Sequence, residues 1–297
     1  MATILSTDLF IPDVFADFIA PIIEKKLILA PLATVNPILE GQPGDEITTS
    51  RWNYSGRADE LTENVPITLR KLSMSQTSYR IKEAGLGFEI TDTATLTALG
   101  NPDSAITQNL ALGIADKVDF DLRTAAELTE TVGTTTYAPL AVPAANKPLS
   151  WARLVRGFGL LGDGYDPSSL SLLISSAQHM QLMVDPLFVS SQTFGEGAVI
   201  VRGFVGRIGQ IPVFVSDRAT DIADVDSVTA GNQAGHRALL IKSGALELSY
   251  KRRPLVEKDR DILSRKDVAV ATVHYGVKRV DDKGVVIIPT NSVIPED

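Results

Sequence analysis

The feature of this sequence that most constrains its fold is a pair of N-terminal segments with too little apolar surface of their own to fold in isolation. Residues 1–38 form an apolar arm. Residues 39–90 form a long polar, hairpin-like stretch with glycines at both roots, in Gly41-Gln42-Pro43-Gly44 and Gly85-Leu86-Gly87. A lone two-stranded ribbon is marginal in water. Both segments therefore need another surface to rest on.

The arm has a helical pattern followed by an extended one. Apolar residues recur at every fourth position from Phe10 to Ile22, which predicts a short amphipathic helix between Pro12 and Lys26. Residues 27–32 are predicted to be extended, because a proline near their end disfavours helix in the residue before it. The arm packs either on its own subunit or on another surface, and the sequence leaves both open.

The polar stretch contains two predicted strands, Ile47–Tyr54 and Leu69–Ile81, with an outer part at 55–68 between them. The larger apolar side chains of the return strand change parity along it, whereas a half-buried strand keeps one parity. These side chains are Leu72 and Met74, then Tyr79 and Ile81. The change predicts a bulge or a ribbon whose two faces meet different partners.

The clearest helix opens at Asn101-Pro102 and is expected to run to about Glu130, a length of roughly 40 Å. Asn101 can cap it, and Asp103 suits the positive end of the helix dipole. An apolar side chain follows at every fourth position, giving one stripe: Ile106, Leu110, Ile114, Val118 and Leu122. Opposite charges four residues apart are expected on the outer side: Lys117 with Asp121, and Asp119 with Arg123.

The remaining sequence predicts a connector, a compact α/β region and a strand-rich end. Residues 131–149 are typical of a connector, because they are rich in threonine, alanine and proline. The expected helices are 150–161, capped by Ser150, and 177–184. The expected strands are 170–174, the hairpin 198–205 with 210–215, then 238–242, 245–251, 268–280 and 285–288, with an acidic loop at 217–235.

Composition argues against a protein that grips nucleic acid by charge. The net charge is −8 at pH 7, and a basic stripe is lacking. The best basic cluster, Lys251-Arg252-Arg253, is interpreted as a solvated strand end. A mean hydropathy of +0.10 indicates either a large core or extra apolar surface reserved for interfaces.

The sequence offers no catalytic, cofactor-binding or metal-binding residues, so we expect no enzyme. His179, His236 and His274 are far apart and form no metal-binding pair. Two carboxylate pairs, Asp224 with Asp226 and Asp119 with Asp121, continue into no calcium loop and are interpreted as loop and helix surface.

Two glycine runs suggest a phosphate loop, but neither carries that interpretation. Gly195-Glu196-Gly197 stands by itself. The run formed by Gly203, Gly206 and Gly209 lies inside a hairpin pattern and opens no helix. The chain has no cysteine, which excludes disulfides and thiolate chemistry. Neither a signal peptide nor a membrane span is predicted.

Taken together, the segments resemble a known family. The order of arm, polar hairpin, long helix and closing strands is similar to that of tailed-bacteriophage major capsid proteins with the Hong Kong 97-type fold. The motifs that carry the resemblance span nearly the whole chain. They are Phe15-Ala16-Asp17, residues 26–32, Gly41-Gln42-Pro43-Gly44-Asp45, Lys82-Glu83-Ala84-Gly85, Glu89-Ile90-Thr91-Asp92, residues 114–122, Arg260-Asp261 and residues 268–275.

The resemblance implies an α+β fold with four parts. They are an N-terminal arm at 1–38, an extended loop at 39–90, a peripheral domain with a long spine helix at 91–138 and 255–297, and an axial domain at 139–254. It also implies assembly of hexamers and pentamers into an icosahedral head shell, with arm and loop lying over neighbouring subunits.

The shell would enclose double-stranded DNA without sequence-specific binding, as part of the virion. Assembly is expected in the host bacterial cytoplasm, with no membrane and no cofactor. The expected partners besides the chain itself are a separate scaffolding protein, since no scaffolding-like domain precedes the arm, a portal and a decoration protein.

Two other functions are compatible with the sequence. An encapsulin-type nanocompartment resembles the same fold but encloses protein cargo, and a soluble α/β enzyme could use the hairpin as a lid. Lys71 and Lys82 lie in or near the extended loop, but their position alone does not support an isopeptide cross-link.

Overall fold

The computed structural model describes residues 27–52, 55–61, 66–72, 74–97, 102–132, 135–143, 147–185, 204–208, 210–216, 221–222, 235–291 and 293. Several predictions lie outside these residues. They are the amphipathic helix before Lys26, the cap at Asn101, the glycines Gly195, Gly197, Gly203 and Gly209, the pair Asp224 and Asp226, and most of the expected strand at 198–205.

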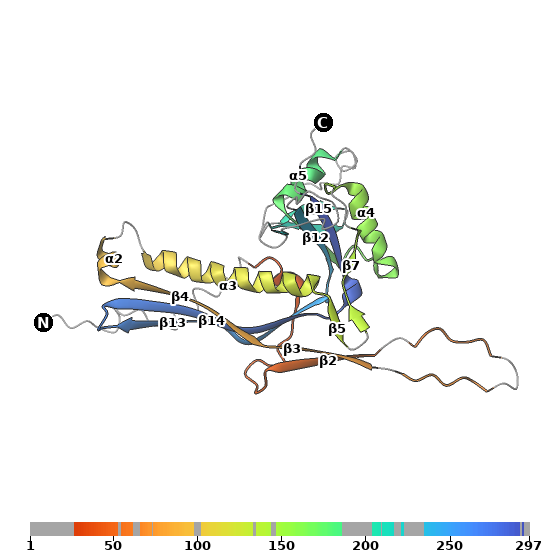
Figure 1. Cartoon of the computed structure of the whole chain (residues 1–297), viewed down its shortest axis with the longest axis horizontal. Helices are drawn as coiled ribbons and strands as arrows, with labels where there is room; N and C mark the ends of the chain where they lie inside the picture. The colour runs from red at the N-terminus through yellow and green to blue at the C-terminus, as the bar shows by residue number, and fades with distance from the viewer. Residues whose placement is uncertain are drawn as a thin grey trace.

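The molecule is elongated, with a long sheet and helix, a ribbon projecting at one end and a lobe beside the carboxyl end of the long helix (Figure 1). The long sheet has the strand order β1-β13-β14-β4. Its strands are β1 (Thr34–Val35), β13 (Leu246–Asp261), β14 (Lys266–Arg279) and β4 (Lys82–Thr91). All its strand pairs are antiparallel except β1 with β13.

Helix α3 (Pro102–Glu127) lies along one face of this sheet, and the short helix α2 (Asp92–Thr97) precedes it (Figure 1). The predicted apolar stripe is confirmed as the buried side, since Leu110 and Leu122 are fully buried in the core that the helix shares with β13 and β14. The stripe therefore joins the helix to the sheet in one hydrophobic core.

The helix ends at Glu127, so the predicted end at Glu130 is wrong. The guanidinium of Arg279 donates to the carbonyl oxygens of Ala125 and Ala126 at the last turn, at 3.3 and 2.8 Å. This cation satisfies carbonyl groups that a helix end leaves without partners. Glu130 instead begins strand β5 (Glu130–Val132).

The two carboxylates expected on the outer side of α3 are buried, and this expectation is wrong. Asp121 does pair with Lys117 at 3.1 Å, but it also accepts from Lys82 at 2.8 Å and from the hydroxyl of Tyr275. Asp119 accepts from the backbone N–H groups at 28 and 29, at 2.9 and 3.1 Å. Asp119 therefore fastens the end of the arm to the helix, by a contact between distant parts of the chain that a helical pattern does not encode.

A seven-stranded sheet forms the core of the lobe, with the main order β7-β15-β12-β8-β10-β9 and β11 paired with β12. In chain order its strands are β7 (Leu140–Ala141), β8 (Leu170–Ile174), β9 (Phe204–Ile208), β10 (Ile211–Val215), β11 (Asp221–Ile222), β12 (Gly235–Lys242) and β15 (Val285–Asn291). The predicted hairpin is confirmed where it is described, with Ile208 opposite Ile211.

Helices α4 (Trp151–Leu160) and α5 (Ser176–Val184) pack on this sheet. Both helices were predicted, and Ser175 caps α5 in a full capping box with Gln178. The predicted cap at Ser150 is wrong, because Ser150 precedes α4 but its side chain makes no capping hydrogen bond. The short 3₁₀ turns of the described residues are η2 (Ala30–Leu32), η3 (Gly162–Gly164) and η5 (Asp282–Gly284). The extended conformation predicted for residues 27–32 is therefore wrong at η2.

The connector predicted at 131–149 is partly wrong, because it contains β5, its partner β6 (Thr135–Tyr137) and β7. The predicted boundary at 254/255 falls inside β13. The last strand, β15, lies in the lobe, where it pairs with β12 over seven residue positions. Alternating apolar residues predict a strand but not its neighbour, so the sequence could not assign these strands to a sheet.

The ribbon consists of β2 (Glu46–Trp52) and β3 (Met74–Arg80), which form a two-stranded sheet of their own. The return strand was expected to begin at Leu69, but it begins at Met74. The parity change has a clear basis: Met74 is 45% exposed, whereas Tyr79 is buried at the ribbon root with Leu39 and Ile47. The two ends of the strand thus meet different surroundings.

Candidate assembly surfaces

The ribbon root is held by a buried polar network. The hydroxyl of Tyr79 donates to the carboxylate of Glu247 at 2.8 Å and lies 2.7 Å from the hydroxyl of Ser249. Asn36, just after β1, donates to the same carboxylate oxygen. Tyr79 also lies close to Gly276, where an added Cβ would come within 2.9 Å of its ring. The network therefore ties the ribbon, the arm and the long sheet together.

Burial raises the pKa of the Tyr79 hydroxyl above its ordinary range, and the neighbouring Glu247 acts in the same direction. The hydroxyl therefore stays protonated and can donate to the buried carboxylate at any physiological pH. The sequence did not predict this contact. Tyr79 drew attention there only because the apolar side chains of its strand change parity.

Replacing Tyr79 by phenylalanine should lower the free energy of unfolding by about 1–3 kcal/mol, because Glu247 loses a hydrogen-bond donor while staying buried. Denaturant unfolding of the purified subunit measures this. Tyr165→Phe is the matched control, since Tyr165 is 44% exposed and its hydroxyl has no hydrogen bond within the described part of the chain. An equal loss in both variants would contradict the role of the network.

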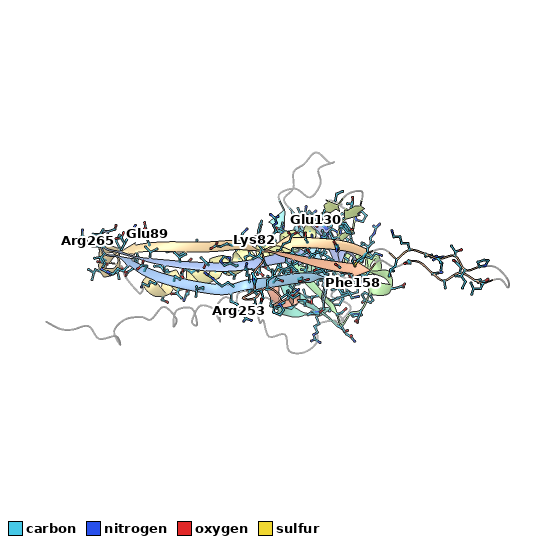
Figure 2. The ribbon with its side chains drawn as sticks, turned by 90° about the horizontal axis from the view of Figure 1, so that it is seen from below. Lys82, Glu89, Glu130, Phe158, Arg253 and Arg265 are labelled. Atoms are coloured by element: carbon cyan, nitrogen blue, oxygen red, sulfur yellow. The ribbon has the colours of Figure 1, made fainter. Side chains whose placement is uncertain are left out.

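The basic cluster Lys251-Arg252-Arg253 also lies at the root, and its interpretation as a strand end is wrong. It stands in the middle of β13, where the register with β14 shifts. Lys251 donates to the carbonyl of Gly44, and Arg253 pairs with Glu40 at 3.0 Å. Figure 2 shows Arg253 near the place where the ribbon joins the sheet. The cluster holds the turn that leads into the ribbon.

The outer loop of the ribbon, residues 55–61 and 66–72, is exposed throughout. Arg70 braces it from within: its guanidinium binds both carboxylate oxygens of Asp59, at 2.6 and 2.7 Å, and the carbonyls of Ser55 and Arg57. The loop nevertheless exposes large apolar side chains, which are Leu61 at 67%, Ile67 at 64%, Leu69 at 93% and Leu72 at 55%.

Such a loop contributes nothing to its own subunit's core. It presents an apolar surface on a partly preformed scaffold, well beyond the end of the sheet (Figure 1). Groups of exposed apolar side chains of this kind mark interaction sites. The outer loop is therefore the first candidate assembly surface.

A second exposed apolar group lies at the opposite end of the long sheet. It comprises Leu96 of α2 together with Ile262 and Leu263 of the turn between β13 and β14. We call this group the sheet tip.

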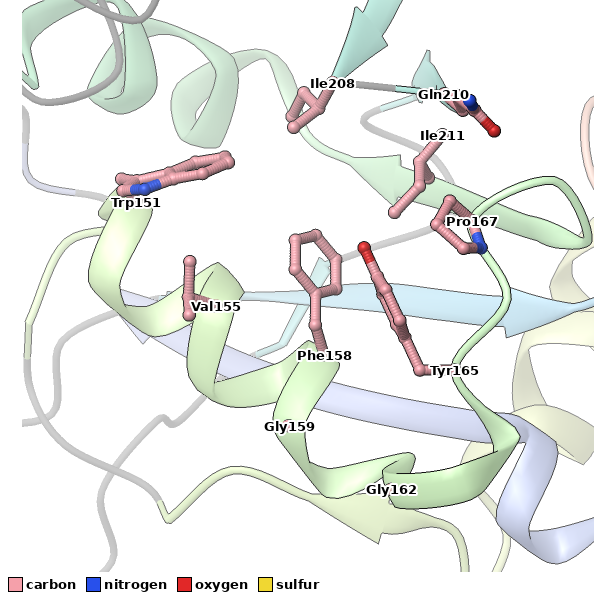
Figure 3. A pocket seen from close by; sticks show the side chains of 10 residues that line it. All are labelled: Trp151, Val155, Phe158, Gly159, Gly162, Tyr165, Pro167, Ile208, Gln210 and Ile211. Carbon is pink, nitrogen blue, oxygen red and sulfur yellow. The ribbon is translucent and has the colours of Figure 1, made fainter.

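A third surface is an open, largely apolar groove on the lobe, beside α4 (Figure 3). The rings of Phe158 and Tyr165 lie on one side, with centroids 5.9 Å apart, and Ile208 and Ile211 face them. Trp151 lies at the end of the groove. Among the described residues that line it, the Tyr165 hydroxyl is the one acid, base or nucleophile, so this part of the groove is suited to apolar packing rather than chemistry.

The three histidines considered as metal ligands lie on separate elements of the structure. His179 is half-buried on α5, where this partial burial lowers its pKa, and His236 is on β12. His274 lies 3.6 Å from Glu83 on the long sheet. Within the described ranges, no three His, Cys, Asp or Glu side chains gather as a metal site would require.

Gly206 pairs with Val213 inside the β9–β10 hairpin, which confirms the location expected for the second glycine run. Lys82 forms an ion pair with Asp121 of its own subunit, and Lys71 is exposed. Among the helices of the described residues, none is both long and apolar enough to cross a membrane.

Comparison with known proteins agrees with this arrangement. The sequence pattern of the phage capsid protein family matches residues 75–288. The major capsid protein of Staphylococcus phage phiMR11 is 27% identical over 294 residues, which cover 95% of this chain and 94% of that protein.

Solved capsid structures share the fold. The capsid of Ralstonia phage GP4 superimposes with a TM-score of 0.66 at 14% identity, over 92% of this chain and 93% of that one. The cyanophage Pam1 capsid gives 0.66 at 15% identity, over 98% and 96%.

The long sheet with its helix, the projecting ribbon and the lobe thus form the Hong Kong 97-type fold of these capsid structures. The chain belongs to the phage capsid protein family. It is a structural protein that assembles into a capsid shell, and not an enzyme with a hairpin lid.

Proposed function

We propose that this chain is the subunit of an icosahedral phage head, arranged as hexamers and pentamers around a double-stranded DNA genome, with the outer loop of each ribbon resting on a neighbouring subunit. The observation that carries the proposal is the outer loop itself. Leu69 is 93% exposed and Ile67 64% exposed, on a loop braced internally by Arg70. Repeated contacts between unlike surfaces, closed by symmetry, build such shells.

The structure supports a division of the chain that follows its sheets. The arm would reach residue 38, and the extended loop would span 39–81, because β4 already lies in the long sheet. The peripheral domain would contain 82–138 and 246–284. The axial domain would contain 139–245 and the last strand, β15. In this proposal the axial lobes meet around the centres of hexamers and pentamers.

The test is assembly of the purified chain. Electron microscopy should show closed shells with the lobes gathered at the capsomer centres. Light scattering that shows a stable monomer under all assembly conditions would contradict the proposal.

A separate scaffolding protein, a portal and a decoration protein are further proposed partners, with assembly in the host bacterial cytoplasm. The matches to phage capsids support a viral shell over an encapsulin-type compartment.

The shell is expected to bind duplex DNA only weakly, because the net charge is −8 and the cations of the best basic cluster serve the ribbon root. Filter binding with purified subunits and empty shells checks this. Tight retention at about physiological salt, falling steeply as salt rises, would show instead a basic DNA-binding surface.

A further inference from the structure

The lobe joins the long sheet and its helix at a junction beside the carboxyl end of α3 (Figure 1). Three short connections cross this junction, between β6 and β7, between β12 and β13, and between β14 and β15. Apolar side chains also meet there, because Leu239 and Ile241 of β12 belong to the core that contains the buried stripe of α3. Burial of apolar area has no preferred direction. The apolar contact alone therefore does not select one angle between the lobe and the helix.

A shared carboxylate adds a directional contact across the junction. Glu127, the last residue of α3, forms an ion pair with Arg123 one turn earlier, at 3.1 Å. The other carboxylate oxygen of Glu127 accepts from the guanidinium of Arg237, which lies on β12 of the lobe. The side chains of Glu127 and Arg123 are only 11% and 10% exposed. Solvent screens charges in such surroundings less than charges at the surface, so the geometry of the contact has a direct energetic consequence.

A second cation fixes the neighbouring connections. Arg279, at the end of β14, is 4% exposed, and it donates to the last carbonyl groups of α3. The same guanidinium donates to the carbonyl of Tyr137, just before β7, at 3.3 Å, and to the carboxylate of Asp282, just before β15, at 2.8 Å. Arg279 therefore holds the chain path at two of the three connections. Arg237 attaches the lobe sheet itself to the helix.

We propose that the Arg237–Glu127 ion pair sets the angle of the lobe on the long helix and, through that angle, the curvature of the shell. This inference rests on the proposed shell function and assigns to these two residues the control of its geometry. Contacts between unlike surfaces close only when the rotation from one subunit to the next fits a symmetric assembly. A lobe at a different angle presents its contact surfaces in a different direction, so the ion pair selects one closed geometry.

The angle can be measured on the subunit before assembly. The chain has no cysteine, so two introduced cysteines provide unique sites for spin labels. Gln108→Cys on α3 and Met180→Cys on α5 use exposed positions, one on the helix and one on the lobe. Pulsed electron paramagnetic resonance should give one narrow distribution of distances between the two labels.

Arg237→Gln should broaden this distribution. Arg237 is 38% exposed, so the subunit should stay folded without its charge. The population with the original lobe angle should fall by about tenfold relative to the others, a change that corresponds to 1.4 kcal/mol. Glu127→Gln breaks the same pair from the side of the helix and should broaden the distribution as well. Circular dichroism checks that each variant is folded.

Two controls make the distance measurement specific. Labels at Gln108→Cys and Glu257→Cys both lie on the unit of helix and long sheet, and their distances should be the same with and without Arg237. Arg207→Gln removes the same charge from an exposed arginine of β9 in the lobe, and it should leave the distances across the junction unchanged.

The same variants test the consequence for the shell. Electron microscopy of assembled particles should show one dominant diameter for the wild type and for Arg207→Gln. Arg237→Gln and Glu127→Gln should lose that uniformity and give mixed diameters or open sheets. Arg237→Lys keeps the charge but loses the planar fork of the guanidinium, so it should give an intermediate result.

Unchanged distances across the junction in both Arg237→Gln and Glu127→Gln would overturn the proposal. Changed distances together with particles of the normal diameter would overturn the control of curvature. Neither result bears on whether the wild-type chain forms shells. A wild-type chain that never forms shells would contradict the proposed function itself, while the label distances would still show whether the ion pair sets the angle.

Discussion

Replacing Leu110 by aspartate is expected to abolish soluble subunit. Leu110 is fully buried at the centre of the α3 stripe, in the core shared with the long sheet. An unpaired carboxylate there costs about 4–5 kcal/mol or more. Folded domains are stable by only about 5–15 kcal/mol, so the loss removes most of the margin. The soluble fraction after expression, followed by circular dichroism of any recovered protein, measures the effect.

Gln108→Asp is the matched control for this experiment. Gln108 lies two residues earlier on the same helix, and it is exposed. The same new charge there should leave yield and assembly close to wild type. Wild-type behaviour of Leu110→Asp would mean that the stripe faces solvent, and the packing of α3 on the sheet would then be incorrect.

The stripe shows what the sequence predicts well. Strict spacing by four defines a helix face, and a face made only of large apolar residues must be buried. Helix α3, its first residue Pro102 and its buried side were therefore all predictable. The end of the helix was not, because the cation that satisfies its last carbonyls, Arg279, comes from the end of β14.

Charged residues were harder to place for the same reason. Asp119 and Asp121 have the spacing of a solvated helix face, yet both are buried. Each has partners far away in the chain: the backbone at 28–29 for Asp119, and Lys82 with Tyr275 for Asp121. A local pattern cannot reveal a partner that only the fold brings close. The network of Tyr79, Glu247 and Asn36 was missed in the same way.

Of the candidate assembly surfaces, the ribbon could be predicted from the sequence and the sheet tip could not. The sequence predicted that the ribbon needs a neighbour, because its composition cannot support it alone. It gave no sign of the sheet tip, since two apolar residues in a turn are ordinary in any sequence. Their significance comes from the exposure of Ile262 and Leu263 and from the contacts that hold the turn.

Deleting the outer loop is expected to leave a folded subunit that cannot form stable shells. Trp52 pairs with Met74 as the last described pair of the ribbon, so an Asn-Gly turn in place of residues 53–73 continues that hairpin. The deletion removes Leu61, Ile67 and Leu69, whose side chains are largely exposed. The root network at Tyr79 is untouched. Circular dichroism and thermal unfolding should stay near wild type, while particles in negative stain disappear or become fragile.

A point variant separates the loop surface from the consequences of a large deletion. Leu69→Asp keeps the full loop and the contact of Arg70 with Asp59, but it puts a charge in place of the Leu69 side chain, which is 93% exposed. It should reproduce the assembly defect without loss of fold. Thr68→Ser, a conservative change at the neighbouring exposed position, should assemble normally. Shells of normal yield and stability from the deletion variant would show that the loop makes no essential contact. The loop does not fill the core of its own subunit, so its proposed role would then be wrong.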